Sequence, residues 1–345
     1  GHRPDAWWCQ HLSGSLNLNQ QGMSIPSGYR GSARSLSSPA LEVRLRRGSS
    51  IESTHKAHAV VCDSRGRVLM RAGQPDFETF IRSALKPFQA LPLISSGASE
   101  TYSCGERGIA ISCGSHSGTP GHAREAFRML WNAELESSDL QCPVPSGRSS
   151  PLEHNCSGKH AAFLITSRKM GWPIETYLQG DHPLQQEVSR RVAELLGLPP
   201  EELVAERDDC GAPTLRLQLD QMALLFAHLG SSTHAELEQI SRAMLAHPEL
   251  VAGEGRFDTE LMRRSHHQVI SKGGAEGIQC LSRTGEGLGV AIKVEDGARR
   301  AKQAVALHLL RQLDWMTPSG LKELEEQLLI LNPGVHLDVE GELRT

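Results

Sequence analysis

The sequence predicts an α+β fold in which an antiparallel sheet from both ends of the chain packs with a helical region. Two strand–turn–strand segments support this prediction, one at residues 58–70 and the other at residues 277–294. Much of the chain between them has the apolar spacing of amphipathic helices. Strands at both ends with helices between them are typical of a sheet assembled from the two terminal regions.

Each strand segment carries turn residues between two apolar runs. The first contains Asp-Ser-Arg-Gly at residues 63–66, and the second contains Thr-Gly-Glu-Gly at residues 284–287. Such clusters between apolar runs are typical of β-hairpins. We therefore expect one hairpin near the start of the fold and another late in the chain.

The helices are predicted from apolar residues that recur at intervals of three and four. The segments with this pattern are residues 119–131, 184–196, 215–229, 237–245 and 298–313. Residues 157–170 show a weaker form of the same pattern.

Composition narrows the class of protein. The chain has 345 residues, of which 39% are hydrophobic and 22% charged, with a formal net charge of −4. This length suits one large domain or two intimate ones. The two signs of charge are interspersed, so neither nucleic acid nor an anionic membrane is expected as a partner. No apolar run reaches the roughly 18 residues that cross a bilayer. A soluble protein is expected.

Residues 1–40 differ from the rest, because no acidic residue occurs between Trp7 and Ala40 and Ser, Gly, Gln and Asn dominate. We expect a disordered tail or a non-native extension there, and a folded domain at residues 41–345. The eight cysteines are scattered, without the close pairs of a finger or ribbon. A reduced, cytoplasmic setting is the simplest interpretation of that scatter.

The strongest chemical motif is Ser83-Ala-Leu-Lys86. On a helix this spacing places the hydroxyl and the amine on one face, about a turn apart. The amine can then remove the hydroxyl proton, provided that burial or nearby cations lower its pKa. Ser53-Thr-His-Lys56 fits the same pattern, but it precedes an expected strand, whereas Ser83 opens an apolar stretch that would bury a helix.

The order of further motifs supports the first one. The segment 112–117 supplies additional serines, and Lys272-Gly273-Gly274 comes just before the late hairpin. Penicillin-binding proteins and class A β-lactamases combine Ser-x-x-Lys with a later serine and a late Lys-x-Gly. The sequence therefore predicts a serine acyl hydrolase.

A second group of residues leaves two interpretations open. His154, Cys156, Lys159, Asp208 and Cys210 include thiols, an imidazole and a carboxylate, which could together bind zinc. Zinc sites usually show ligands paired at short spacing, and these fall in two clusters far apart in sequence. Buried polar structure is therefore the competing interpretation.

Several of these segments together resemble the asparaginase II family typified by the Rhizobium etli enzymes. The resemblance spans roughly residues 41–340. The matching segments are residues 52–61, 82–87, 113–117, 155–160, 209–214, 247–256, 272–276 and 289–297.

This resemblance implies a fold like that of the serine β-lactamases and penicillin-binding proteins, a homodimer, and hydrolysis of L-asparagine to L-aspartate and ammonia. It also implies two serine–lysine tandems, Ser83 with Lys86 and Ser115 with Lys272, as catalytic residues. In the mechanism we expect, Ser83 attacks the side-chain amide with Lys86 as general base.

The resemblance further implies a zinc site on Cys156, Lys159 and Cys210. Asp208 and His160 match family positions near the site, and we expect them to bind substrate, Asp208 through the ammonium group. Two rival functions remain. One is another acyl hydrolase on the same scaffold, such as a β-lactamase or D-peptidase, and the other is a catalytically inactive binding protein.

Overall fold

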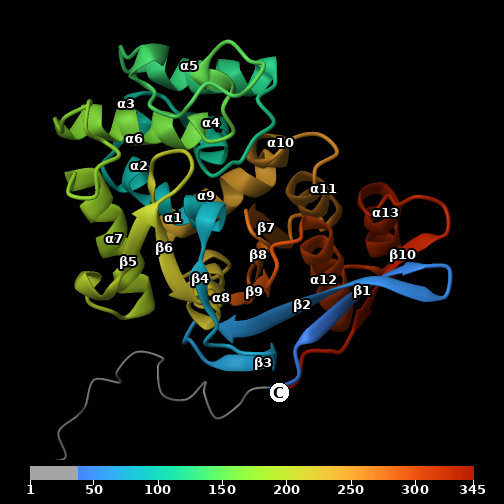
Figure 1. Ribbon diagram of the computed structural model, residues 1–345. Coiled ribbons are helices and arrows are strands. Elements are labelled where there is room, and N and C mark those ends of the chain that lie inside the picture. Colours follow the sequence, from blue (N-terminus) through green and yellow to red (C-terminus); the bar gives the residue numbers. More distant parts are fainter. Residues whose placement is uncertain (1–37) are drawn as a thin grey trace, which may run out of the picture.

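A computed structural model describes residues 38–345 (Figure 1). The prediction of a disordered tail at residues 1–40 falls almost entirely outside this part of the chain. Within it, residues 38–40 lie against Gly73, whose N–H donates to the carbonyl oxygens of Ser38 and Pro39, both at 3.1 Å.

The main sheet has seven strands and is built from both ends of the chain, as predicted. Its strand order is β10-β1-β2-β9-β8-β7, and β3 also pairs with β2. All of these pairings are antiparallel. The strands are β1 (Leu41–Arg47), β2 (Ser50–Asp63), β3 (Val68–Ala72), β7 (Val269–Gly274), β8 (Ile278–Arg283), β9 (Leu288–Val294) and β10 (Val335–Glu340).

The two ends of the chain meet where β2 pairs with β9. Val60 lies opposite Ala291, and both side chains belong to the core on one face of the sheet. Val61 lies opposite Val290, and these two belong to the core on the other face. Because side chains alternate along a strand, this junction is buried on both sides. This pairing joins the N-terminal and C-terminal strands into one sheet.

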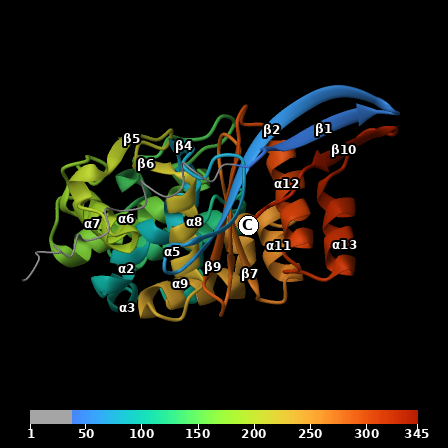
Figure 2. The ribbon, with the colours of Figure 1, turned by 90° about the horizontal axis from the view of Figure 1, so that it is seen from below.

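Helices cover both faces of the sheet (Figure 2). Helix α8 (Leu219–Leu229) packs on β2, β8 and β9. It approaches so closely that a Cβ on Gly289 would lie 2.0 Å from the Ala223 carbonyl oxygen. Helices α12 (Arg299–Gln312) and α13 (Pro318–Leu328) lie on the opposite side, with α12 against the sheet.

The remaining helices form the helical region and the link to β7. They are α1 (Lys86–Gln89), α2 (Leu91–Ser95), α3 (Ala98–Thr101), α4 (Gly105–Ser112), α5 (Pro120–Asn132), α6 (Ser157–Met170), α7 (Pro183–Leu196), α9 (Ala235–Ala246), α10 (Pro248–Val251) and α11 (Phe257–Arg264). A small antiparallel sheet borders this region, in the order β4 (Glu78–Phe80), β6 (Pro213–Gln218), β5 (Val204–Arg207).

Both predicted hairpins are confirmed, as β2–β3 and β8–β9. The predicted helices are also present, with one correction at residues 215–229. The first residues of that segment belong to β6, and α8 starts only at Leu219. Leu215 and Leu217 are buried while Arg216 is exposed, which is the alternation of a strand with partners on both sides. No helix in the described chain is long and apolar enough to span a membrane.

Candidate active site

Ser83 lies in a short 3-10 turn, η2 (Arg82–Leu85), which leads directly into α1. The preceding residue, Arg82, has a φ of +53°, a conformation that is costly for a residue with a side chain. Its N–H donates to the Thr214 hydroxyl at 3.1 Å, which anchors the turn to β6. This anchored bend presents Ser83 to a cavity of about 320 Å³.

Ser115 lies in the loop after α4, docked against α10. Its N–H donates to the Val251 carbonyl at 2.8 Å. A Cβ on Gly114 would lie 2.4 Å from the Leu250 carbonyl oxygen, so the close approach of this loop requires glycine at that position. Ser115 lines the same cavity as Ser83.

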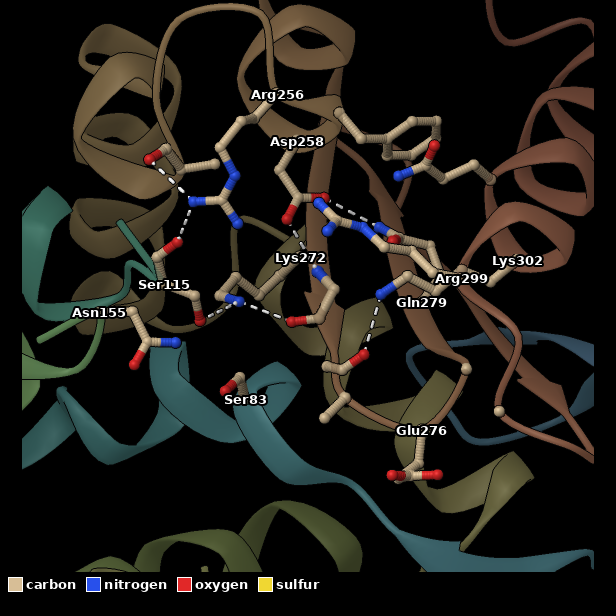
Figure 3. A pocket seen from close by; sticks show the side chains of 18 residues that line it. Ser83, Ser115, Asn155, Arg256, Asp258, Lys272, Glu276, Gln279, Arg299 and Lys302 are labelled. Atoms are coloured by element: carbon tan, nitrogen blue, oxygen red, sulfur yellow. Dashed lines mark hydrogen bonds between the residues drawn. The ribbon is translucent and has the colours of Figure 1, made fainter. Parts of the chain in front are cut away.

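Two lysines converge on the Ser115 hydroxyl. Lys86 Nζ donates to Ser115 Oγ at 2.9 Å and to the Gly114 carbonyl at 2.6 Å. Lys272 Nζ, from β7, donates to Ser115 Oγ at 3.0 Å and to the Gly273 carbonyl at 2.6 Å (Figure 3). The structure thus brings Ser83, Lys86, Ser115 and Lys272 to one place.

Within this group, the pairing differs from the expected one. Lys86 binds Ser115, and the Ser83 hydroxyl makes no hydrogen bond to any residue that the structure describes. Ser83 follows the bend at Arg82, in a 3-10 turn that ends as α1 begins with Lys86. The motif therefore does not lie on one continuous α-helix, which was the basis of the expected contact.

The environment of both lysines favours the neutral amine. Burial, together with the charge of Lys86, lowers the pKa of Lys272 to about 7. Burial and the charge of Lys159 also lower the pKa of Lys86, against the opposing effect of Cys156 and Cys210. A lysine near its pKa at neutral pH can act as a general base.

Asp258 supports Lys272 from behind, and sequence reasoning missed it. Its carboxylate accepts from the Ser271 hydroxyl at 2.6 Å, from Gln279 Nε2 at 3.0 Å and from the Gly273 N–H at 3.0 Å. These bonds fix the strand that carries Lys272. The pattern around Asp258 resembles an ordinary helix start, so only tertiary contact reveals its place.

Asn155 and Arg256 also belong to the site. Both line the cavity, and the Asn155 side chain lies near the two serines (Figure 3). Arg256 Nη1 donates to the Ser115 carbonyl at 2.6 Å and to the Ala252 carbonyl at 3.1 Å, which ties the serine loop to the loop before α11. Their only sequence signal is membership of the two segments 155–160 and 247–256.

Cys156, Lys159 and Cys210 form a second buried cluster beside Lys86. Lys159 Nζ lies 3.2 Å from Cys210 Sγ. A hydrogen bond from Cys210 and the charges of Lys86 and Lys159 lower the pKa of Cys156 well below its ordinary value, despite burial. The same hydrogen bond and burial raise the pKa of Cys210. The pair therefore shares one proton, with the thiolate on Cys156.

Lys159 has the opposite behaviour to the lysines at Ser115. Burial lowers its pKa, but the sulfurs of Cys156 and Cys210 outweigh burial and raise it overall. The sequence-proposed metal ligands thus lie together. In the described chain, no group of three or more His, Cys, Asp or Glu side chains is arranged to hold a metal ion, and this cluster supplies two sulfurs and an amine.

The two residues expected to bind substrate lie outside the lining of the cavity. Asp208 is close by, because its Oδ1 pairs with Arg82 Nη2 at 2.9 Å next to Ser83. His160 is buried in α6, where its Nδ1 lies 2.7 Å from the Tyr177 hydroxyl. Burial and the charge of Lys159 lower its pKa well below the usual value, so the ring is neutral.

Comparison with solved structures gives distant matches. Mglu is 12% identical, with 75% of this chain and 67% of Mglu covered and a TM-score of 0.41. A Bacillus glutaminase is 12% identical, with 75% of this chain and 91% of that chain covered and a TM-score of 0.35. A β-lactamase from Mycobacterium bovis is 12% identical, with 76% and 95% covered and a TM-score of 0.35.

These similarities are too low to carry an argument about function. Coverage of the other Mglu chains is also partial, down to 59% of their length. No curated protein matches the sequence.

Comparison with family models gives a clear result. The model described as L-asparaginase II matches residues 43–345, which include every residue of the serine–lysine and cysteine–lysine clusters. Because this match covers most of the chain, the protein belongs to the L-asparaginase II family.

Proposed function

We propose that the protein hydrolyses L-asparagine to L-aspartate and ammonia through an acyl-enzyme on Ser83. Family membership supports the reaction class. The observation that carries the mechanism is the position of Ser115 Oγ, within 3.0 Å of two lysine amines in the cavity that Ser83 also lines. A hydroxyl held in this way can pass protons between the amines and a substrate.

In the acylation step, Ser83 Oγ attacks the side-chain carboxamide carbon and its proton goes to Lys86. The proton then passes through Ser115 Oγ to the amide nitrogen, the C–N bond breaks, and ammonia leaves. Lys272 holds Ser115 in place and can resupply its proton. Water then attacks the ester carbon and gives a proton to Lys86, which returns it to Ser83 Oγ as the ester bond breaks and aspartate is released.

The negative charge that develops on the carbonyl oxygen needs hydrogen-bond donors. We assign this role to the backbone N–H groups of Ser83 and Ala275. Gly274 lies close to the Ser83 turn, since a Cβ added to this glycine would lie 2.9 Å from the Ile81 carbonyl oxygen. Among described residues no acceptor is found for the Ala275 N–H, and both residues line the cavity. Such preorganised donors contribute strongly to acyl transfer.

Asp208 is proposed to bind the substrate ammonium group. Its Oδ1 accepts from Arg82 Nε at 3.0 Å and from the Asp209 N–H at 2.7 Å, and its Oδ2 makes no such contact within the described chain. His160 is proposed to support this side of the site from within the core, because it neighbours Lys159 in α6.

We also propose a zinc ion held by Cys156, Lys159 and Cys210. Two sulfurs and a nitrogen are donors that suit zinc, and the nearby charges already favour the thiolate of Cys156. Lys159 must lose its proton to bind, which its raised pKa opposes. When bound, zinc supplies positive charge and Lewis acidity beside Lys86. We expect removal of zinc by chelation to raise KM while changing Tm little. Purified active protein without metal would contradict the assignment.

The reaction is tested by measuring ammonia release from L-asparagine and L-glutamine, beside hydrolysis of a chromogenic β-lactam. We expect release from asparagine and no β-lactam turnover. Acid quenching during turnover should trap an aspartyl ester on the peptide that contains Ser83, and Ser83→Ala should abolish it. A near-normal rate in Ser83→Ala would move the nucleophile to Ser115, and turnover of the β-lactam alone would favour the rival acyl hydrolase.

We propose that the protein forms a homodimer and lies in the cytoplasm. The cytoplasmic location is supported by the seven cysteines of the described chain, all of which are free thiols. Light scattering on the eluting protein tests the dimer, and a monomeric mass would contradict it.

A further inference from the structure

The cavity continues from the two serines toward the start of α12, and this end carries excess positive charge. Of the described residues that line the cavity, four are basic and two are acidic. The basic residues are Arg256, Lys272, Arg299 and Lys302, and the acidic ones are Asp258 and Glu276. In Figure 3, Arg299 and Lys302 lie across the view from Ser83 and Asn155, with Lys272 between them.

The two carboxylates offset only part of this charge, and Asp258 acts on both Arg256 and Lys302. Asp258 already accepts three hydrogen bonds, from Ser271, Gly273 and Gln279. Glu276 is exposed at the rim, where its charge acts on Lys293. The basic side chains outnumber the acidic ones, so a net positive charge remains for a ligand that enters the cavity.

Burial disfavours the charged forms of these basic side chains. It lowers the pKa of both Arg256 and Lys302, the Asp258 carboxylate raises it, and the charge of Arg299 lowers it by less than Asp258 raises it. An anion bound beside these partly desolvated cations would favour their charged forms.

The three side chains differ in how far they are already engaged. Arg256 Nη1 donates to the carbonyls of the serine loop, and Lys302 Nζ donates to the Gly274 and Ile278 carbonyls at 2.8 Å and 3.1 Å. Arg299 has no hydrogen-bond or ion-pair partner among the residues that the structure describes. Its guanidinium is the group left for a ligand.

We propose that Arg299, backed by Lys302, binds a carboxylate of the substrate, so that the enzyme selects amides that also carry an acid group. This rests on the proposed function, because it assigns specificity to the same cavity. A guanidinium suits a carboxylate through two parallel hydrogen bonds, and the N-terminal turn of α12 adds a favourable dipole.

The test compares two amides of similar size, succinamic acid, which has one carboxylate, and succinamide, which has none. We expect the wild-type protein to prefer succinamic acid in kcat/KM. Arg299→Gln should reduce kcat/KM for succinamic acid about tenfold more than for succinamide, mainly through KM. Arg300→Gln is the matched control, since Arg300 is exposed, contacts His55 and does not line the cavity. Equal losses for the two amides in Arg299→Gln would overturn the proposal.

A binding measurement separates this proposal from the proposed function. Succinate has no amide to hydrolyse, so calorimetric titration with succinate reports on the carboxylate site even if no amide is turned over. We expect Arg299→Gln to weaken succinate binding about tenfold and Arg300→Gln to leave it unchanged. Succinate affinity that is the same in wild type and Arg299→Gln would overturn the carboxylate site, whereas absence of ammonia from every amide would contradict only the proposed hydrolysis.

Discussion

Two buried clusters lie side by side in this protein, and both are built around lysine. At the serine cluster, Lys86 and Lys272 meet hydroxyl and carbonyl oxygens, and burial lowers the pKa of both amines. At the cysteine cluster, Lys159 meets two sulfurs that raise its pKa despite equal burial. The residue type is the same, so the partners decide whether the pKa of the buried amine falls or rises.

The difference separates two chemical roles. A neutral amine beside a hydroxyl can accept protons, whereas an ammonium held by a thiolate is a stable ion pair until something displaces its proton. Lys86 belongs to both settings, because the Cys156 thiolate also acts on it. Changes in the cysteine cluster should therefore reach the serine cluster through this amine.

The largest effect is expected from removing the hydroxyl that the serine cluster shares. Ser115→Ala deletes the acceptor of both lysine amines and interrupts the proton path, so kcat should fall by about three orders of magnitude. Steady-state ammonia release measures this, and Tm should stay within a few degrees. Ser117→Ala, two residues along the same loop, is the control, and a rate in Ser115→Ala close to that of the control would remove the shared hydroxyl from the mechanism.

The next effect concerns the ion pair of the cysteine cluster. In protein freed of metal, Cys156→Ala leaves the Lys159 ammonium buried with a weaker counter-charge, which should destabilise the fold by about 3–5 kcal/mol. Adding Lys159→Met to that variant should recover part of the loss. Urea unfolding of the single and double variants measures both values. Additive losses would show that the sulfur and the amine do not interact.

At the serine cluster the effect on stability has the opposite origin. Folded Lys272 loses its proton near pH 7, but the unfolded chain keeps that proton until about the ordinary lysine value. The native state binds fewer protons across that interval, so this residue lowers stability most at and below pH 7, and the penalty shrinks as pH rises toward 10. Lys272→Met should therefore raise Tm by several degrees at pH 7 and little at pH 10. A gain independent of pH would contradict the lowered pKa.

The smallest effect is a shift in the pH dependence of activity. The Lys272 amine loses its proton with a pKa of about 7 and can then accept a proton from Ser115, so kcat/KM should rise with an apparent pKa of about 7. The Asp258 carboxylate raises the pKa of Lys272, and Asp258→Asn should move this rise to lower pH by less than about one unit. If the rise in kcat/KM of a stably folded Asp258→Asn variant stayed at the same pH or moved to higher pH, a group other than Lys272 would control it.

Much of the architecture could be predicted because periodicity and turn residues are local signals. The β2–β3 and β8–β9 hairpins and the helices α5, α6, α7, α9 and α12 all lie where the apolar spacing indicates. Residues 215–218 were misassigned because leucines at intervals of two preceded a longer helical pattern, and only pairing with β4 and β5 settles them as a strand. Tertiary pairing overrides such local preference.

For the site, residue types and their order predicted which side chains would gather, but the contacts among them needed the structure. The spacing of Ser83 and Lys86 suggests a direct hydrogen bond between them. The chain bends at Arg82 and forms a 3-10 turn, and Lys86 donates its hydrogen bond to Ser115 instead. Asp258 and Arg299 belong to no recognised sequence motif. Their place in the cavity depends on tertiary contacts, which no local pattern encodes.

The pairing of β2 with β9 has a consequence for how the protein folds during synthesis on the ribosome. Val61 and Val290 are neighbours in the sheet but far apart in the chain. A contact of such long range closes a large loop and makes assembly slow. Ser83, the proposed nucleophile, is synthesised early, whereas Lys272 is synthesised after most of the helices. An incomplete nascent chain therefore carries Ser83 without Lys272, and the proposed amidase activity should appear only once β7 to β9 have left the exit tunnel.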